Sequence, residues 1–185
     1  MSKLPFLAAA FFAGLAVAIL MNRGDTDAPA QPAAAPAPVA AAPAGPAPSA
    51  ILAASFDQPD NVITIYKAPT CGCCGDWAAH LEENGFEVRE IERPDMHNVK
   101  AEVGVPGEMH SCHTAMVGGE LVEGHVPADV LRDYLADEAV RSASLGLAVP
   151  GMPVGSPGME IEGQPADAYD VMAFSSEGAT AYASR

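Results

Sequence analysis

Three of the four cysteines of this chain stand within four residues, at Cys71, Cys73 and Cys74. The β-branched and aromatic residues 62–66 before them predict a strand, and residues 76–83 after them predict a helix. Backbone N–H groups at a helix N-terminus favour the thiolate, which is the nucleophilic and metal-binding form of cysteine. The spacing therefore predicts a reactive or metal-binding thiol loop between a strand and a helix.

The crowding of these thiols favours a cluster of Cu(I) ions over a single zinc ion. A tetrahedral zinc site usually takes thiolates two to four residues apart, whereas Cys73 and Cys74 are neighbours whose sulfurs diverge. Cu(I) is a soft ion, and thiolates that each bridge two ions allow a short run of cysteines to hold several of them. We expect a polynuclear Cu(I) site. A structural zinc ion or an iron–sulfur centre held by all four cysteines is an alternative.

A disulfide role is the other interpretation of these cysteines. An even number of cysteines is typical of structural disulfides in exported proteins, but a bridge between neighbours or across one residue is strained. Cys71 and Cys74 form a C-x-x-C motif in the place where a thiol-disulfide oxidoreductase would use it. A membrane-tethered oxidoreductase is therefore the main alternative function, although Cys73 would compete for the same disulfide.

The elements that must position these residues follow the order β-α-β-α-β-β-α. After the first strand and helix come a strand at residues 86–91, a helix at 95–103, a hairpin at 113–123 and a helix that begins near Pro127. This is the order of a thioredoxin-like α/β domain. By analogy with that fold, Cys112 at the start of the hairpin should approach the thiol loop and supply a fourth sulfur.

The C-terminal part of the chain is rich in glycine, proline and methionine and then ends in a hairpin. The triplet Pro-Gly-Met occurs at residues 150–152 and again at 157–159, which excludes a helix there, and residues 169–183 predict two strands. We expect this Gly/Pro/Met-rich segment to wrap over the domain. Met152 and Met159 are candidate thioether ligands of copper, although methionine also fills gaps in a core.

The first 60 residues predict export and tethering. Residues 4–21 carry no charge and are long enough to cross a bilayer, and Lys3 weakly places the rest of the chain outside the cytoplasm. We expect residues 1–23 to be a signal peptide or membrane anchor, with an uncleaved anchor in the inner membrane favoured. Residues 24–60 are expected to form an Ala/Pro-rich linker, and residues 61–185 the metal-binding domain.

The charge of the chain argues against nucleic acid as a partner. The formal net charge is -15, and residues from 51 onward hold 22 acidic and seven basic side chains. Phosphate binding needs a basic surface, so the chain is not expected to bind nucleic acid. An acidic surface attracts cations, although it also serves simply to keep a protein soluble.

Four motifs in the same order resemble the CopG-type copper-resistance proteins, a family long catalogued as a domain of unknown function. They lie at residues 66–74, 111–115, 123–127 and 146–159, and the similarity spans about residues 61–184. The resemblance implies a periplasmic, thioredoxin-like protein that handles copper through a multinuclear copper–thiolate cluster. By motif, it implies Cys71, Cys73, Cys74 and Cys112 as the cluster ligands. Sequestration or redox conversion of copper would follow, the latter with a periplasmic electron-transfer or copper-handling partner, and enzyme status stays open.

The histidines are weaker candidates. His110 and His113 flank Cys112, and a strand would place only one of them on the same face as that thiol. We expect His125 to fix a turn and His80 to lie exposed on its helix. Trp77, one helical turn from Cys73, is expected to pack and to exclude water from a cluster.

Overall fold

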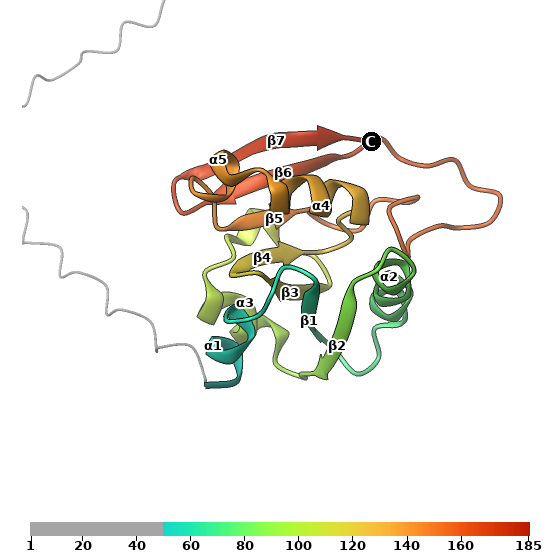
Figure 1. The fold of residues 1–185 in the computed structure, drawn as a ribbon. Coiled ribbons are helices and arrows are strands. Elements are labelled where there is room, and N and C mark those ends of the chain that lie inside the picture. The colour runs from blue at the N-terminus through green and yellow to red at the C-terminus, as the bar shows by residue number, and fades with distance from the viewer. Residues whose placement is uncertain (1–49) are drawn as a thin grey trace, which may run out of the picture. The chain divides into compact units, whose positions relative to one another are not determined.

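The domain is built on one seven-stranded mixed sheet, shown in the computed structural model of Figure 1, which describes residues 50–185. The strand order is β2-β1-β3-β4-β5-β6-β7. Strand β1 is parallel to β2 and β4 is parallel to β5, whereas the other neighbours are antiparallel. The strands are β1 Val62–Lys67, β2 Glu87–Glu92, β3 His113–Val117, β4 Glu120–Glu123, β5 Gly146–Ala148, β6 Asp170–Ser175 and β7 Gly178–Ser184.

Helices connect the strands in the order that the sequence predicts. The helices are α1 Ala50–Phe56, α2 Gly72–Glu83, α3 Met96–Val103, the short 3-10 helix η1 Gly107–Met109, α4 Ala128–Ala136 and α5 Glu138–Arg141. Between residues 62 and 136 the order is β1-α2-β2-α3-β3-β4-α4, so the predicted α/β class and element order are confirmed, in agreement with a thioredoxin-like arrangement. Gly104, with φ of +79°, ends α3 as expected.

Apolar side chains on the two faces of the sheet form two separate cores. Successive residues of a strand point to opposite faces, so neighbours in β1 and β3 belong to different cores. The first core lies with α2 and α4 and the second with α1 and α3. Their main members are Ile63, Ile65, Trp77, Leu81, Ala115, Leu131 and Tyr134 in the first, and Leu52, Tyr66, Val99, Met116, Leu121 and Phe174 in the second.

Helix α1 lies within the stretch that the sequence assigned to the linker. Leu52 of this helix is fully buried in the second core, and Ser55 Oγ lies 2.7 Å from the hydroxyl of Tyr66. Residues 50–56 are therefore part of the folded domain, because apolar and small residues one helical turn apart find a sheet face to cover. Residues 24–49 of the linker expected at 24–60, and the signal peptide or anchor expected at residues 1–23, lie outside the described residues.

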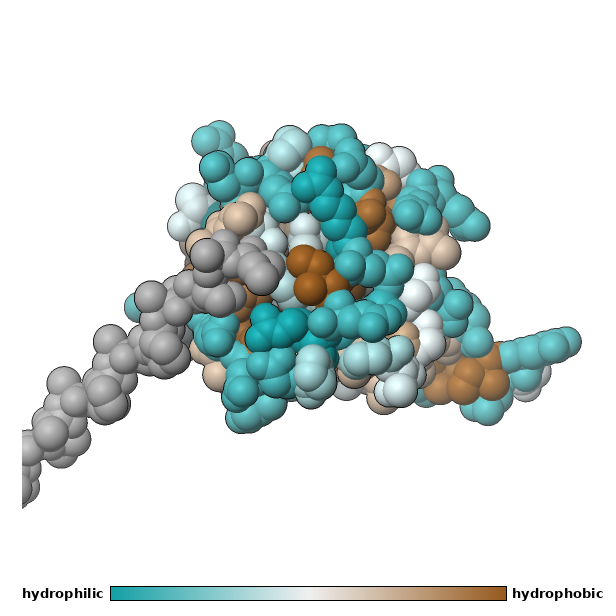
Figure 2. Space-filling model, turned by 90° about the horizontal axis from the view of Figure 1, so that it is seen from below, coloured by the Kyte–Doolittle hydropathy of each residue, from teal (hydrophilic) through white to brown (hydrophobic). Residues whose placement is uncertain are grey.

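The C-terminal segment adds three strands to the sheet. The predicted terminal hairpin is confirmed as β6 and β7, and β5 joins that hairpin to β4. Strand β5 and helix α5 were not predicted, since three and four residues give too short a pattern to recognise. Among the helices of the described residues, none is both long and apolar enough to span a membrane. The face of the domain shown in Figure 2 is mostly hydrophilic, with apolar side chains in separate patches.

Candidate metal centre

The thiol loop lies between the end of β1 and the first turn of α2. Cys71 is the N-cap residue of α2, and Cys73 and Cys74 occupy its first turn. The first N–H groups of a helix have no partner within the helix, so this turn presents positive partial charge to the sulfurs. No acidic residue lies in the first turn to oppose that charge. The helix N-terminus therefore favours thiolates at these positions, as the sequence predicts.

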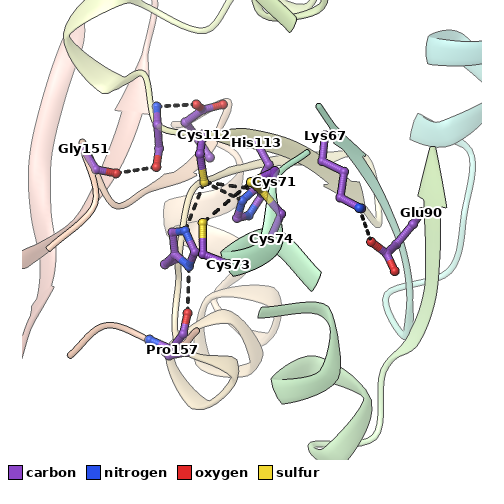
Figure 3. The surroundings of a disulfide bond; sticks show 12 residues. Lys67, Cys71, Cys73, Cys74, Glu90, Cys112, His113, Gly151 and Pro157 are labelled. Atoms are coloured by element: carbon purple, nitrogen blue, oxygen red, sulfur yellow. Dashed lines mark hydrogen bonds and ion pairs between the residues drawn. A yellow bond between two sulfur atoms is a disulfide. The ribbon is translucent and has the colours of Figure 1, made fainter. Parts of the chain in front are cut away.

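The structure brings all four cysteines together (Figure 3). The four Sγ atoms lie within 4.8 Å of one another. Cys71 and Cys74 form a disulfide with their Cα atoms 5.4 Å apart, whereas Cys73 and Cys112 carry thiols. Cys73 Sγ lies 3.7 Å from Cys71 Sγ, and Cys112 Sγ lies 3.5 Å from Cys74 Sγ. The expected approach of Cys112 to the thiol loop is thus observed, and each thiol touches one sulfur of the disulfide.

Two imidazoles complete the surroundings of Cys112. Its Sγ lies 3.2 Å from Nδ1 of His113 and 3.1 Å from Nε2 of His125. His125 Nδ1 lies 2.7 Å from the carbonyl oxygen of Pro157, and a carbonyl only accepts, so Nδ1 carries the proton. His125 Nε2 therefore offers its lone pair to the Cys112 thiol or to a metal ion. Cys112, His113 and His125 form a second group whose ligand atoms lie within 4.8 Å of one another.

Burial keeps these groups uncharged. Burial lowers the pKa of His113 well below its usual range, with nearby His125 and Lys100 acting in the same direction. Burial also lowers the pKa of His125, against the opposing effect of its bond to Pro157. The pKa of the Cys112 thiol rises to about 12 through burial and the neighbouring Cys73. At neutral pH both imidazoles are neutral, which is the form that binds metals.

Trp77 forms one wall of the candidate metal centre, which comprises the four cysteines, His113 and His125. Its indole N–H donates to the carbonyl of Val126 at 2.9 Å, and its ring lies 4.3 Å from that of His113, centroid to centroid. Both side chains are fully buried. Within residues 50–185, no hydrogen-bond partner lies near Nε2 of His113. The packing expected of Trp77 is observed, and it encloses His113, one of the two histidines that flank Cys112 in the sequence.

The Gly/Pro/Met-rich segment folds back over the domain as expected, and it contacts α2 and His125. Pro157 holds His125, and a Cβ atom on Gly158 would lie 2.7 Å from the backbone nitrogen of Trp77 and 2.8 Å from the carbonyl oxygen of Cys73. Met159 is partly buried, and Met152 is 52% exposed. The structure therefore places the segment against the thiol loop, whereas the copper-ligand role of the two methionines stays a prediction.

Two solved structures are similar to this chain. The copper resistance protein CopG, form 1, is 46% identical with a TM-score of 0.61, over 67% of this chain and 96% of that chain. Form 2 of the same name is 48% identical with a TM-score of 0.60, over 67% of this chain and 97% of that chain. The chain belongs to the CopG-type copper-resistance family.

A second comparison covers a shorter part of this CopG-type chain. A family model described as "Protein of unknown function, DUF411" matches residues 109–159. That range holds Cys112, both imidazoles beside it and the Gly/Pro/Met-rich segment, but not the thiol loop. No curated protein matches the chain. The resemblance expected from the four motifs is confirmed.

Sequence reasoning missed His125 in this CopG-type domain and misjudged His110. His125 was expected to fix a turn, but the β3–β4 pairing brings it next to Cys112. Instead, Nε2 of His110 lies 3.2 Å from the carbonyl oxygen of Val105. The alternation of side chains along a strand could not show which histidine lies beside Cys112, because β3 begins only at His113. His80, expected to be exposed, is partly buried and accepts the backbone N–H of Ala128 at the start of α4.

The donor set fits soft metal ions. Four sulfurs and a neutral imidazole nitrogen suit Cu(I), and the short sulfur–sulfur distances allow bridging thiolates. All four sulfurs can bind as thiolates only after the Cys71–Cys74 disulfide takes up two electrons. This arrangement would therefore present all four sulfurs to a metal ion only when Cys71 and Cys74 are reduced.

Proposed function

We propose that this protein binds several Cu(I) ions in a thiolate cluster and acts in copper resistance. Membership of the copper-resistance family and the cysteine group support a copper-related function. The observation that carries the finer proposal is the convergence of four Sγ atoms within 4.8 Å at a helix N-terminus. Cys71, Cys73, Cys74 and Cys112 would be the ligands.

Copper suits this arrangement better than zinc. Zinc requires four ligands at tetrahedral angles around one ion, whereas Cys73 and Cys74 are adjacent in one helical turn. Thiolates that bridge two Cu(I) ions have no such requirement, and the pairs Cys71–Cys73 and Cys74–Cys112 already have sulfur separations of 3.7 and 3.5 Å. His125 Nε2 is available as a further donor. The chemistry of the donor set thus favours a small copper cluster.

Copper resistance can follow from sequestration or from redox conversion. Sequestration requires only that the reduced cysteines release their protons and bind Cu(I). In redox conversion, two thiolates, Cys71 and Cys74, would pass one electron each to two Cu(II) ions, which gives two Cu(I) ions and the disulfide. A dithiol reductant would then return two electrons and two protons to the disulfide. A periplasmic electron-transfer or copper-handling protein would be the partner for that step.

A thiol-disulfide oxidoreductase is the second candidate function. The Cys71–Cys74 disulfide at the N-terminus of α2 favours it, since this is where a C-x-x-C pair lowers a thiol pKa and exchanges disulfides. Cys112, 3.5 Å from Cys74 Sγ, could then act as a resolving thiol. In that case Cys73 would be dispensable for activity, whereas a copper cluster would need it, and this difference separates the two candidate functions.

The metal content of reduced protein tests the proposal. Protein reduced without oxygen is titrated with Cu(I), freed of excess copper and analysed for metal and sulfur, as wild type and as Cys73→Ser and Cys112→Ser variants. We expect more than one copper per wild-type chain and a lower ratio in both variants. One copper or less per chain, or unchanged ratios in the variants with intact disulfide exchange, would favour the oxidoreductase. Zinc or iron bound in preference to copper contradicts the proposal directly.

We further propose that the domain works in the periplasm, tethered to the inner membrane through residues 4–21. The support is the uncharged stretch of eighteen residues followed by an Ala/Pro-rich segment. Fractionation of cells and the N-terminal sequence of the recovered protein test it. Release of a processed chain into the periplasm would replace the anchor with a cleaved signal, and recovery from the cytoplasm contradicts both.

A further inference from the structure

A buried ion pair contacts the segment that carries Cys112. Lys100 of α3 and Glu123 at the end of β4 have side chains that are 6% and 0% exposed, and Lys100 Nζ lies 2.5 Å from Glu123 Oε1. A buried pair of this kind is weak evidence for stability, because removing two charges from water offsets most of their attraction. The other contacts of the Glu123 carboxylate explain the position of the pair better than stability does.

The Glu123 carboxylate joins segments on both sides of Cys112. Its Oε1 accepts the backbone N–H of Ser111 at 2.6 Å, and its Oε2 accepts the hydroxyl of Thr114 at 2.7 Å. Thr114 Oγ1 in turn accepts from Lys100 Nζ at 2.9 Å. Within residues 50–185, the hydrogen bonds of this carboxylate are thus to the ammonium group or to residues within two positions of Cys112.

Ser111 is the point through which this network reaches the metal centre. It lies between η1 and β3, outside helices and strands, so no ladder of backbone bonds fixes it. Its hydroxyl donates to the carbonyl of Gly151, and a Cβ atom on Gly124 would come within 2.6 Å of Ser111 Cβ. Ser111 is therefore held by Glu123 on its backbone side and by the C-terminal segment on its side-chain side.

We propose that Glu123 is a positioning residue of the metal centre, which fixes Cys112 Sγ by accepting the Ser111 N–H. Lys100 Nζ holds the same buried carboxylate from its other side. The proposal deepens the proposed copper function and rests on it, since Cys112 is the one cysteine that comes from outside the thiol loop. Residues that orient metal ligands typically change metal affinity 10- to 100-fold when replaced.

Two double variants isolate the hydrogen bond from the charges. K100M/E123Q and K100M/E123L both remove the ion pair, but only the glutamine amide oxygen can still accept the Ser111 N–H. Cu(I) affinity is measured by anaerobic competition with a chromophoric Cu(I) chelator. We expect K100M/E123Q to bind within about threefold of wild type and K100M/E123L to bind about 10- to 100-fold more weakly. Equal affinities of the two folded doubles would overturn the proposal.

The same change in a Cys112→Ser background shows whether the effect passes through Cys112. The K100M/E123L pair should then have no further effect on copper affinity, because the positioned thiol is already absent. A persistent 10-fold loss in that background would mean that the network acts on the fold as a whole, which contradicts a positioning role.

Two further measurements keep the test decisive. If K100M/E123L does not fold, Glu123→Asp replaces it, because aspartate keeps the charge but is one methylene too short to reach Ser111. We then expect Glu123→Asp to weaken copper binding more than K100M/E123Q does, and the reverse order overturns the proposal.

Alkylation of Cys112 in reduced, copper-free protein should be at least about threefold faster in the leucine or aspartate variant than in wild type. This readout separates failure of the positioning role from failure of copper binding itself.

Discussion

At the scale of single residues, Cys112 differs from the other three cysteines in its partners. The thiol loop lies at the N-terminus of α2, whereas Cys112 lies between two neutral imidazoles, at 3.2 Å from His113 and 3.1 Å from His125. Burial raises its pKa to about 12, so the thiol keeps its proton at neutral pH until a cation competes for it. In the proposed copper site, Cys112 is therefore the thiol that depends most on a neighbouring donor such as His125 Nε2.

Replacing His125 should weaken copper binding. In His125→Ala the lone pair of Nε2 is lost and the Pro157 carbonyl loses its donor, so we expect Cu(I) affinity to fall about 10- to 100-fold. The chelator competition described above measures it. His110→Ala is the matched control, because His110 is two residues from Cys112 but bonds to Val105 instead. An equal loss in both variants would mean that histidine near Cys112 matters only for folding.

At the scale of elements, the C-terminal segment acts as a cover for the first turn of α2. Gly158, with φ of +80°, brings its backbone against Trp77 and Cys73 in a way that no side chain allows. Pro157 beside it orients His125. In the second Pro-Gly-Met triplet, the glycine and the proline carbonyl therefore make the contacts with α2 and His125.

Gly158→Ala should destabilise the domain more than Gly151→Ala. Both glycines have positive φ, at +80° and +71°, so both substitutions cost about 1–2 kcal/mol of backbone strain. Only at Gly158 would the new Cβ meet backbone atoms, at 2.7 and 2.8 Å, whereas nothing lies within 4 Å at Gly151. We expect Gly158→Ala to lower the free energy of unfolding by at least about 1 kcal/mol more than the control, in urea denaturation. Equal effects would mean that the segment does not press on α2.

The elements that the sequence predicted correctly are those with their own local signals. The hairpin of β3 and β4 has two short strand-forming runs around Gly118-Gly119, and both glycines adopt positive φ. Strand β5 has no such signal, since residues 146–148 are recognisable as a strand only from their pairing with β4 and β6. The thiol loop was predictable from its cysteine spacing, but His125 joins the site through strand register that no local pattern encodes.

At the scale of the whole domain, function depends on two cores that stabilise opposite faces of one sheet. The first core packs α2, and with it the thiol loop, onto the sheet, and the second packs α3, which carries Lys100. Helix α1 completes the second core with Leu52. Residues 50–56 thus belong to the folded unit.

Leu52→Ala tests whether α1 is an integral part of this domain. Leu52 is fully buried against the second core, so its truncation should lower the free energy of unfolding by about 2–3 kcal/mol through lost burial and a residual cavity. Ile161→Ala is the matched control: Ile161 is 43% exposed, and its loss should change stability by no more than about 0.5 kcal/mol. Chemical denaturation of both variants gives the comparison.

Because the candidate metal centre lies with the first core, copper stoichiometry should stay at the wild-type value in folded Leu52→Ala. A stability change as small as that of the control would return residues 50–56 to the linker, whereas loss of copper from the folded variant would show that the two cores are coupled through the sheet.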